Sequence, residues 1–209
     1  MTPVYKLSAN SVKNGRTVYG SMLAGNTAFE PSFYDSIATV TVGVTSVASV
    51  TFSSIPATYT HLQIRAFAQT NRGTFGTDGM SLRINGDTTG SYIYHYLRGN
   101  GATATAAAGG ASSTNIAEVG TQGVGTTTGG TFGAHIIDIL DYANTNKYKT
   151  MRNLHGNDIN GTVGGSPGFV GLTSALWMKT DAITSLVFTG DNSFTQYTHF
   201  ALYGIKGAA

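Results

Sequence analysis

The segment Gly164–Gly168, with the sequence Gly-Gly-Ser-Pro-Gly, has the spacing of the nucleophile elbow of serine hydrolases. In such an elbow a strand precedes the serine, a helix follows it, and the next residue donates its backbone N–H to the oxyanion. Here the next residue is Pro167, which has no N–H. The surrounding sequence predicts loop and strand. The motif therefore does not indicate a hydrolase.

The histidines are the next residues that could support chemistry, because two histidines and a carboxylate can hold a metal ion. The five of them fall on five different predicted strands: His61, His95, His135, His155 and His199. The chain contains no His-x-Asp or His-x-Glu pair, and His135 and Asp138 are at the shortest His–carboxylate spacing in the sequence, three residues. Residues three apart on a strand point to opposite faces. We therefore expect no metal site.

Carboxylates and loops add no further chemistry. Asp138 and Asp141 are also three apart, so they would not face each other as a glycosidase pair, and Asp141 is better explained as a turn residue. The segment Asn157–Gly161 resembles part of a calcium loop but lacks the closing glutamate. The sequence thus predicts a protein that is not an enzyme, with no catalytic residues, cofactor or metal ion.

Tyr92, Tyr94 and Tyr96 alternate with other residues and would share one face of a strand. A row of tyrosines can stack against sugars. The same row can equally form the packed face of a sandwich or a subunit interface. Both interpretations remain open from the sequence, with core or interface favoured over glycan binding.

Residues 1–35 differ from the rest, because their aromatic residues show neither strand nor helix periodicity. One interpretation is a loosely ordered terminus. Disordered tails are normally poor in aromatic residues, so we favour an arm that docks on a neighbouring subunit or partner. Its candidate docking residues are Tyr5, Tyr19, Phe29, Phe33 and Tyr34.

The rest of the chain, 36–209, is organised around the segment Phe132–His155, which predicts two strands joined by a polar turn at Asn144–Asn146. In the second strand Thr150, Arg152 and Leu154 share one face, and their neighbours share the other. Ala102–Ser113 is of low complexity and is expected to be a loop. About ten strands and no helix are predicted, which favours a jelly-roll-like antiparallel β-sandwich with an extended N-terminal arm. Further strands are expected in the segments Ser36–Gly43, His61–Ala68, Phe169–Met178, Ile183–Thr189 and His199–Lys206.

The composition narrows the possible partners. Only 11% of the 209 residues are charged, the net charge is +2, and Lys and Arg are scattered, which argues against nucleic acid as a partner. No apolar run reaches the ~20 residues of a membrane span, and the first residues lack the layout of a secretory signal. There is no cysteine, so disulfides and thiolate metal sites are excluded.

Several strings of this sequence resemble a family of small β-sandwich virion proteins of tailed bacteriophages, of the type found in cyanophages and marine phages. They lie between Ser36 and Gly207, but they are structural strings rather than catalytic motifs. The matching segments are Ser36–Val42, Val50–Pro56, Tyr59–Leu62, Ile84–Asp87, Asp138–Thr150, Ser174–Trp177, Ala182–Ser185 and Ala201–Gly207.

The resemblance implies a non-enzymatic structural component of the virion, assembled in the host cytoplasm. It would decorate or cement the head, or attach to the tail, through contacts with major capsid or tail proteins. A homo-oligomer is expected, with a trimer favoured. Neither nucleic acid nor a membrane is expected as a partner. The alternative is a carbohydrate-binding, receptor-recognition module of a fibre or tail tip that uses the tyrosine row.

Overall fold

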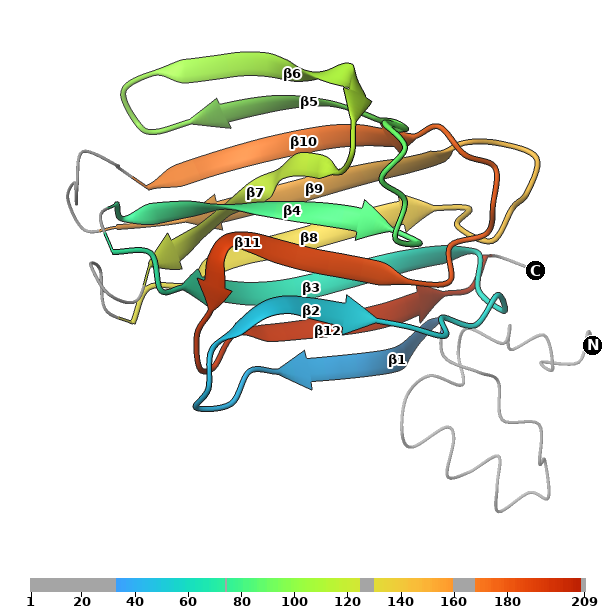
Figure 1. Ribbon diagram of the computed structural model, residues 1–209, viewed down its shortest axis with the longest axis horizontal. Helices are drawn as coiled ribbons and strands as arrows, with labels where there is room; N and C mark the ends of the chain where they lie inside the picture. Colours follow the sequence, from blue (N-terminus) through green and yellow to red (C-terminus); the bar gives the residue numbers. More distant parts are fainter. Residues whose placement is uncertain (1–32, 74, 125–129, 160–167, 208–209) are drawn as a thin grey trace, which may run out of the picture.

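The computed structural model describes residues 33–73, 75–124, 130–159 and 168–207, which form twelve β-strands and no helix (Figure 1). The predicted fold class, an all-β sandwich, is confirmed. In chain order the strands are β1 (Tyr34–Thr41), β2 (Val47–Phe52), β3 (His61–Thr70), β4 (Thr77–Ile84), β5 (Tyr92–Gly99), β6 (Ala104–Ser113), β7 (Ile116–Val124), β8 (Gly133–Leu140), β9 (Lys149–Asn157), β10 (Phe169–Trp177), β11 (Leu186–Phe194) and β12 (His199–Ile205).

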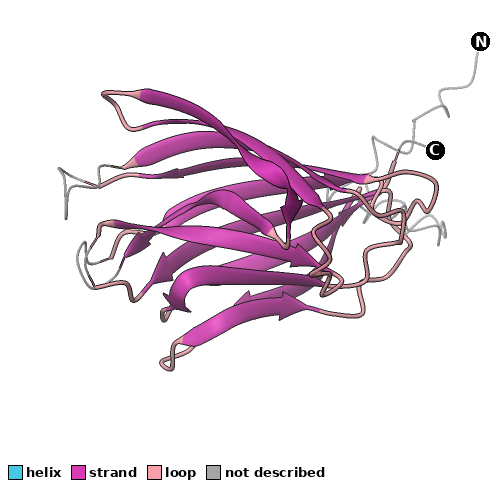
Figure 2. Ribbon diagram, turned by 45° about the horizontal axis from the view of Figure 1, so that its top comes forward, coloured by secondary structure: helices cyan, strands magenta, loops and turns pink. Residues whose placement is uncertain are grey.

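The strands form two layers, which Figure 2 shows from a second side. The larger layer, sheet A, has the antiparallel order β1-β12-β3-β8-β9-β10-β5-β6. The smaller layer, sheet B, has the antiparallel order β2-β11-β4-β7. The layers join at one end, where β3 and β7 run parallel for two residues at Gln69 and Thr70. Because sheet A has more strands than sheet B, part of it extends beyond the smaller layer.

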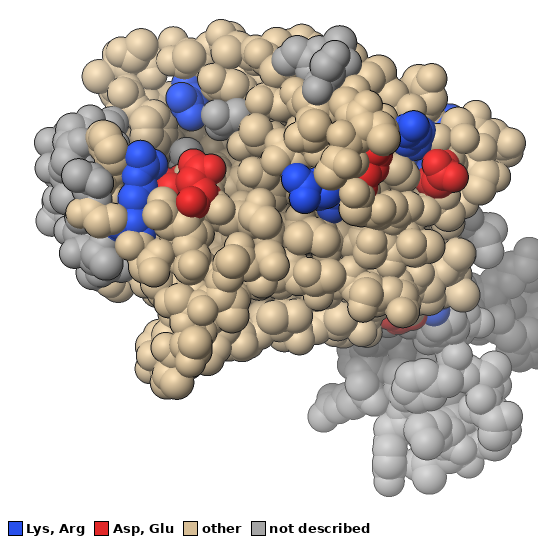
Figure 3. All heavy atoms as spheres, viewed as in Figure 1, with Lys and Arg blue, Asp and Glu red and all other residues tan. Residues whose placement is uncertain are grey.

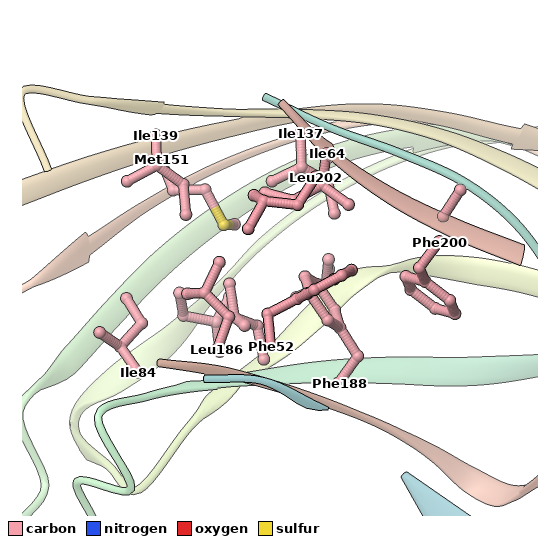
Figure 4. Close-up of a cluster of buried hydrophobic side chains, with 14 of the residues drawn as sticks. Phe52, Ile64, Ile84, Ile137, Ile139, Met151, Leu186, Phe188, Phe200 and Leu202 are labelled. Carbon is pink, nitrogen blue, oxygen red and sulfur yellow. The ribbon is translucent and has the colours of Figure 1, made fainter. Parts of the chain in front are cut away.

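The core lies between the two sheets and follows the alternation of the strands. Sheet A contributes Ile64, Ile137 and Leu202, and sheet B contributes Leu186 and Phe188, all fully buried. Figure 4 shows these side chains meeting across the space between the layers. On most strands every second residue faces this core, as expected when one side of a sheet is packed, whereas Ala104–Ala108 of β6 are exposed on both sides.

The predicted central hairpin is confirmed as β8 and β9, in the middle of sheet A. The burial of β9 alternates as the sequence indicates, with Met151 and Asn153 inward and Arg152 and Leu154 outward. Asp141 closes β8 with a positive φ of 48°, which fits its prediction as a turn residue.

The prediction that Ala102–Ser113 is a loop is wrong, because Ala104–Ser113 forms β6 at the edge of sheet A. Its alanine, glycine, serine and threonine residues carry no alternation that the sequence could reveal, and Ala104–Ala108 are exposed on both faces. Gly109 has a specific role, since a Cβ there would lie 2.1 Å from Cζ of Tyr94. The strand is therefore defined by its pairing with β5 and not by its own residues.

Two strand boundaries also differ from those predicted from the sequence. β1 begins at Tyr34, so Tyr34 and Asp35 belong to sheet A rather than to the arm predicted over residues 1–35. The glycine- and threonine-rich sequence of Gly120–Gly130 predicts a loop, whereas β7 runs on to Val124. The remainder of the arm, residues 1–32, lies outside the described residues.

Candidate functional site

The side of sheet A that points away from sheet B carries a group of exposed apolar side chains. Their exposed fractions lie between 42% and 63%. We call this group the apolar outer face; it consists of Phe67, Leu97, Ile136, Leu154, Val170 and Leu172. The solvent face of an antiparallel sheet is normally polar, so these residues need a separate explanation.

Four members of the apolar outer face form one continuous row across the sheet. Ile136 of β8 pairs with Leu154 of β9, and Leu154 pairs with Leu172 of β10. Leu172 in turn pairs with Leu97 of β5. Directly paired side chains on one face lie about 5 Å apart. The row is therefore a contiguous apolar strip four strands wide, not a set of isolated exposed residues.

Beside this strip the surface is hollowed. Ala134 of β8 pairs with Gly156 of β9, and between them they place almost no side chain on the outer face. The larger side chains of Phe67 on β3 and Val170 on β10 flank these two small residues on either side. The result is an open hollow of about 580 Å³ with apolar walls. Its shape could accept a large apolar side chain.

On the other side of the strip lies a charged border. Asp138 and Arg152 are directly paired across β8 and β9. The amide nitrogen of Gln63 donates a hydrogen bond to Asp138 at 2.8 Å, and Arg65 Nε donates one to Gln63 at 3.0 Å. Both signs of charge are thus present at one edge of the apolar outer face. Elsewhere charge is sparse, and Figure 3 shows only small charged groups on the side of the molecule that it presents.

The inner face of sheet A holds a buried polar cluster formed by His135, Asn153 and His155. The two imidazole rings stack, with centroids 5.9 Å apart and planes 17° from parallel. Neither ring nitrogen of His135 makes a hydrogen bond of normal geometry within the described part of the chain, and the same holds for the side-chain amide of Asn153. Buried polar groups are usually paired, so the burial of His135 and Asn153 without normal hydrogen bonds is expected to lower the stability of the fold.

Burial strongly favours the neutral form of both histidines. Desolvation, together with repulsion from His155, lowers the pKa of His135 to about 3, although the nearby Val119 carbonyl acts in the opposite direction. Desolvation, together with the positive charge of Arg98, lowers the pKa of His155 to about 4. A general base that works near neutral pH needs a pKa near 7. The cluster does not have the electrostatics of such a base.

Two glycines make room for this stacked pair. A Cβ at Gly120 of β7 would lie 2.7 Å from Cγ of His155 and 2.8 Å from Cε1 of His135. A Cβ at Gly171 of β10 would lie 2.4 Å from Nε2 of His155. The φ of Gly120 is +147°, which other residues rarely adopt. The two rings therefore fill a slot that is bounded by the backbones of both sheets.

The other histidines stay apart on β3, β5 and β12, as their separate predicted strands indicated. Within the described ranges no three or more His, Cys, Asp or Glu residues gather where they could hold a metal ion. Asp138 accepts its hydrogen bond from Gln63 on the outer face while His135 is buried, so the predicted opposite orientation of these two residues is confirmed. Among the described residues no helix is long and apolar enough to cross a membrane.

The three tyrosines share one face of β5, as predicted, and it is the inner one, paired with Thr173, Ala175 and Trp177 of β10. Tyr92 is fully buried, and its hydroxyl accepts a hydrogen bond from the Ile84 N–H at 2.9 Å. This burial contradicts a glycan-binding role for Tyr92. Tyr94 packs against the core, and Tyr96 lies beneath Arg98, whose Cζ is 5.0 Å from the ring centroid. For Tyr94 and Tyr96 the interface and glycan interpretations stay predictions.

The remaining candidate residues are not brought together. Phe33 and Tyr34 are exposed at the start of β1, whereas Tyr5, Tyr19 and Phe29 lie outside the described residues. Ser166 and Pro167 of the elbow-like motif also lie outside them. Asp141 is bound by the Lys147 amino group and stands 3.5 Å from Nδ1 of His61, which places it in the loop network after β8.

Sequence reasoning missed the apolar outer face and the histidine pair. Comparison of the chain with protein-family models, with curated proteins and with solved structures finds no match.

Proposed function

We propose that this protein is a non-enzymatic structural component of a tailed-phage virion that works through protein–protein contacts. It would decorate or cement the head, or attach to the tail. The observation that carries the proposal is the apolar outer face, with its strip from Ile136 to Leu97. The resemblance in the sequence supplies the kind of particle.

The size of this surface supports a role in assembly. The six side chains of the apolar outer face expose on the order of 500 Å² of apolar area, which is near the upper end of the roughly 300–600 Å² seen for the largest patch on a monomer. Patches of this extent are often functional. An open sheet face without a deep cleft also suits a broad protein contact better than the enclosure of a small molecule.

The proposal can be tested in two stages. Antibodies raised against the purified chain should label particles of the phage that encodes it, on the head or on the tail, in electron micrographs. Particles that carry no label, whether intact or gently opened, would contradict the virion assignment.

The second stage links the particle to the surface. Leu154→Lys should leave the sandwich folded, because Leu154 is exposed, but should strongly reduce incorporation into particles. Thr51→Lys on β2 is the matched control, since Thr51 is exposed on the outer side of sheet B. Equal incorporation of the two variants would contradict a role for the apolar outer face.

A further inference from the structure

We infer that the apolar outer face packs against the same face of a second copy of this chain, around a two-fold axis that runs along the strands between β8 and β9. The inference rests on the proposed function, in which the protein acts through protein contacts, and it names the partner. Three properties of the face lead to it: its area, the match of its rows under this rotation, and its charges.

The area is sufficient for a stable pair. A standard interface takes about 800 Å² from each partner, and the apolar side chains alone supply on the order of 500 Å². The polar border and the surrounding strands supply the rest. A core of apolar residues with charge at its rim is the usual anatomy of an interface between identical chains.

The rows of the face match themselves under this rotation. A two-fold axis along the strands turns the face over without changing the order of residues along them, so β8 of one copy lies on β9 of the other. Ile136 then faces Leu154, and Phe67 of β3 faces Val170 of β10. Apolar side chains therefore meet near the axis in the row of Ile136, whereas Ala134 of each copy faces Gly156 of the other, so that the two hollows adjoin. Packed sheets cross at about 30°, so the match is closest at β8 and β9.

The charges match as well. The same rotation places Asp138 of one copy opposite Arg152 of the other, and it does so twice, because an isologous contact repeats itself. Arg65 falls opposite Leu172, where its alkyl stem can cover the leucine. No like charges face each other near the axis.

The first experiment measures the mass of the full chain in solution by light scattering after gel filtration, over a range of concentrations. We expect twice the mass of one chain. Leu154→Lys and, independently, Leu172→Lys should weaken the association by on the order of a hundredfold or more, because a buried leucine is lost and a charge gained on each copy. Thr51→Lys should not change it. Circular dichroism checks that each variant is folded.

The second experiment tests the two-fold geometry through charge. Asp138→Arg makes both members of the Asp138/Arg152 pair positive and Arg152→Asp makes both negative, so each variant alone should associate at least tenfold more weakly than the original chain. An equimolar mixture of the two should form one-to-one pairs with an affinity within a few-fold of the original, which native mass spectrometry can count. The two like charges within each variant chain repel each other equally when the variant is alone and when it is mixed. Recovery of affinity in the mixture therefore requires that the charges of one copy contact those of the other.

Outcomes that overturn the inference are distinct from those that overturn the proposed function. A mass of one chain or of three chains, association that survives both leucine variants, or a mixture without one-to-one pairs contradicts the two-fold contact. If the original chain is monomeric and Leu154→Lys still fails to enter particles, the proposed function stands and the face binds a different virion protein.

Discussion

The buried histidine pair should make the fold sensitive to mild acid. His135 and His155 have pKa values lowered to about 3 and about 4, mainly by desolvation, against about 6.5 in an unfolded chain. Between these values the unfolded chain binds protons that the folded protein does not. The free energy of unfolding therefore falls as the pH drops below 6.5, and the loss levels off only when the folded histidines titrate.

The size of the effect follows from these values. At pH 5 the unfolded histidines are almost fully protonated and the folded ones almost fully neutral, so each costs about 2 kcal/mol relative to pH 8. Together they remove about 4 kcal/mol, a large part of the 5–15 kcal/mol that stabilises a typical domain. The carboxylates Asp87 and Asp141 add little to the change in stability between pH 8 and pH 5, because their pKa values are lowered and their stabilisation is lost only in stronger acid.

Urea unfolding followed by circular dichroism between pH 8 and pH 5 measures this slope, at one fixed chain concentration because association adds to apparent stability. The double variant His135→Gln and His155→Gln should lose most of the slope, whatever its absolute stability. His95→Gln is the control, because His95 is exposed on β5, and should keep the slope. A change below about 1 kcal/mol in the original chain, or a full slope in the double variant, would refute the reasoning.

Three further substitutions test individual contacts, each through the free energy of unfolding. Tyr92→Phe should cost about 1–3 kcal/mol, because the buried Ile84 N–H loses the hydroxyl that accepts its hydrogen bond; no loss would mean that the backbone finds another partner. Lys149→Met should cost a similar ~1–3 kcal/mol, because the buried amino group donates to the carbonyls of Asn144, Lys147 and Thr180, whereas the exposed Lys147→Met should cost less. Gly120→Ala should cost about 1–3 kcal/mol by pressing on both imidazole rings; Gly43→Ala, with open space around it, is its control.

Much of the fold could be predicted because many strands have one buried and one exposed face. β8, β9 and β10 show this alternation, and their positions agree with the structure. β6 could not be predicted in this way. Its first residues are exposed on both sides, so no selection for alternating polarity acts on them, and only its pairing with β5 makes it a strand.

The apolar outer face could not be predicted from the sequence for a different reason. Both faces of β9 and β10 carry apolar residues, such as Met151 and Leu154, so alternation alone does not say which set points inward. The continuity of the strip also depends on the pairing of β10 with β5, strands far apart in the sequence. Strand order in a sandwich is a property of the whole chain, and several orders are compatible with one pattern of strands.

The β8–β9 register, in contrast, could have been read from the sequence once the turn at Asn144–Asn146 was recognised. In an antiparallel hairpin centred on Thr145, residues equally distant from the centre face each other, and His135 and His155 are such a pair. The same rule pairs Ile136 with Leu154 and Asp138 with Arg152 on the opposite side. A slip of one residue would turn every side chain of one strand to the other face. One local turn thus sets the register that places His135 beside His155 on the inner side and Ile136 beside Leu154 on the outer side.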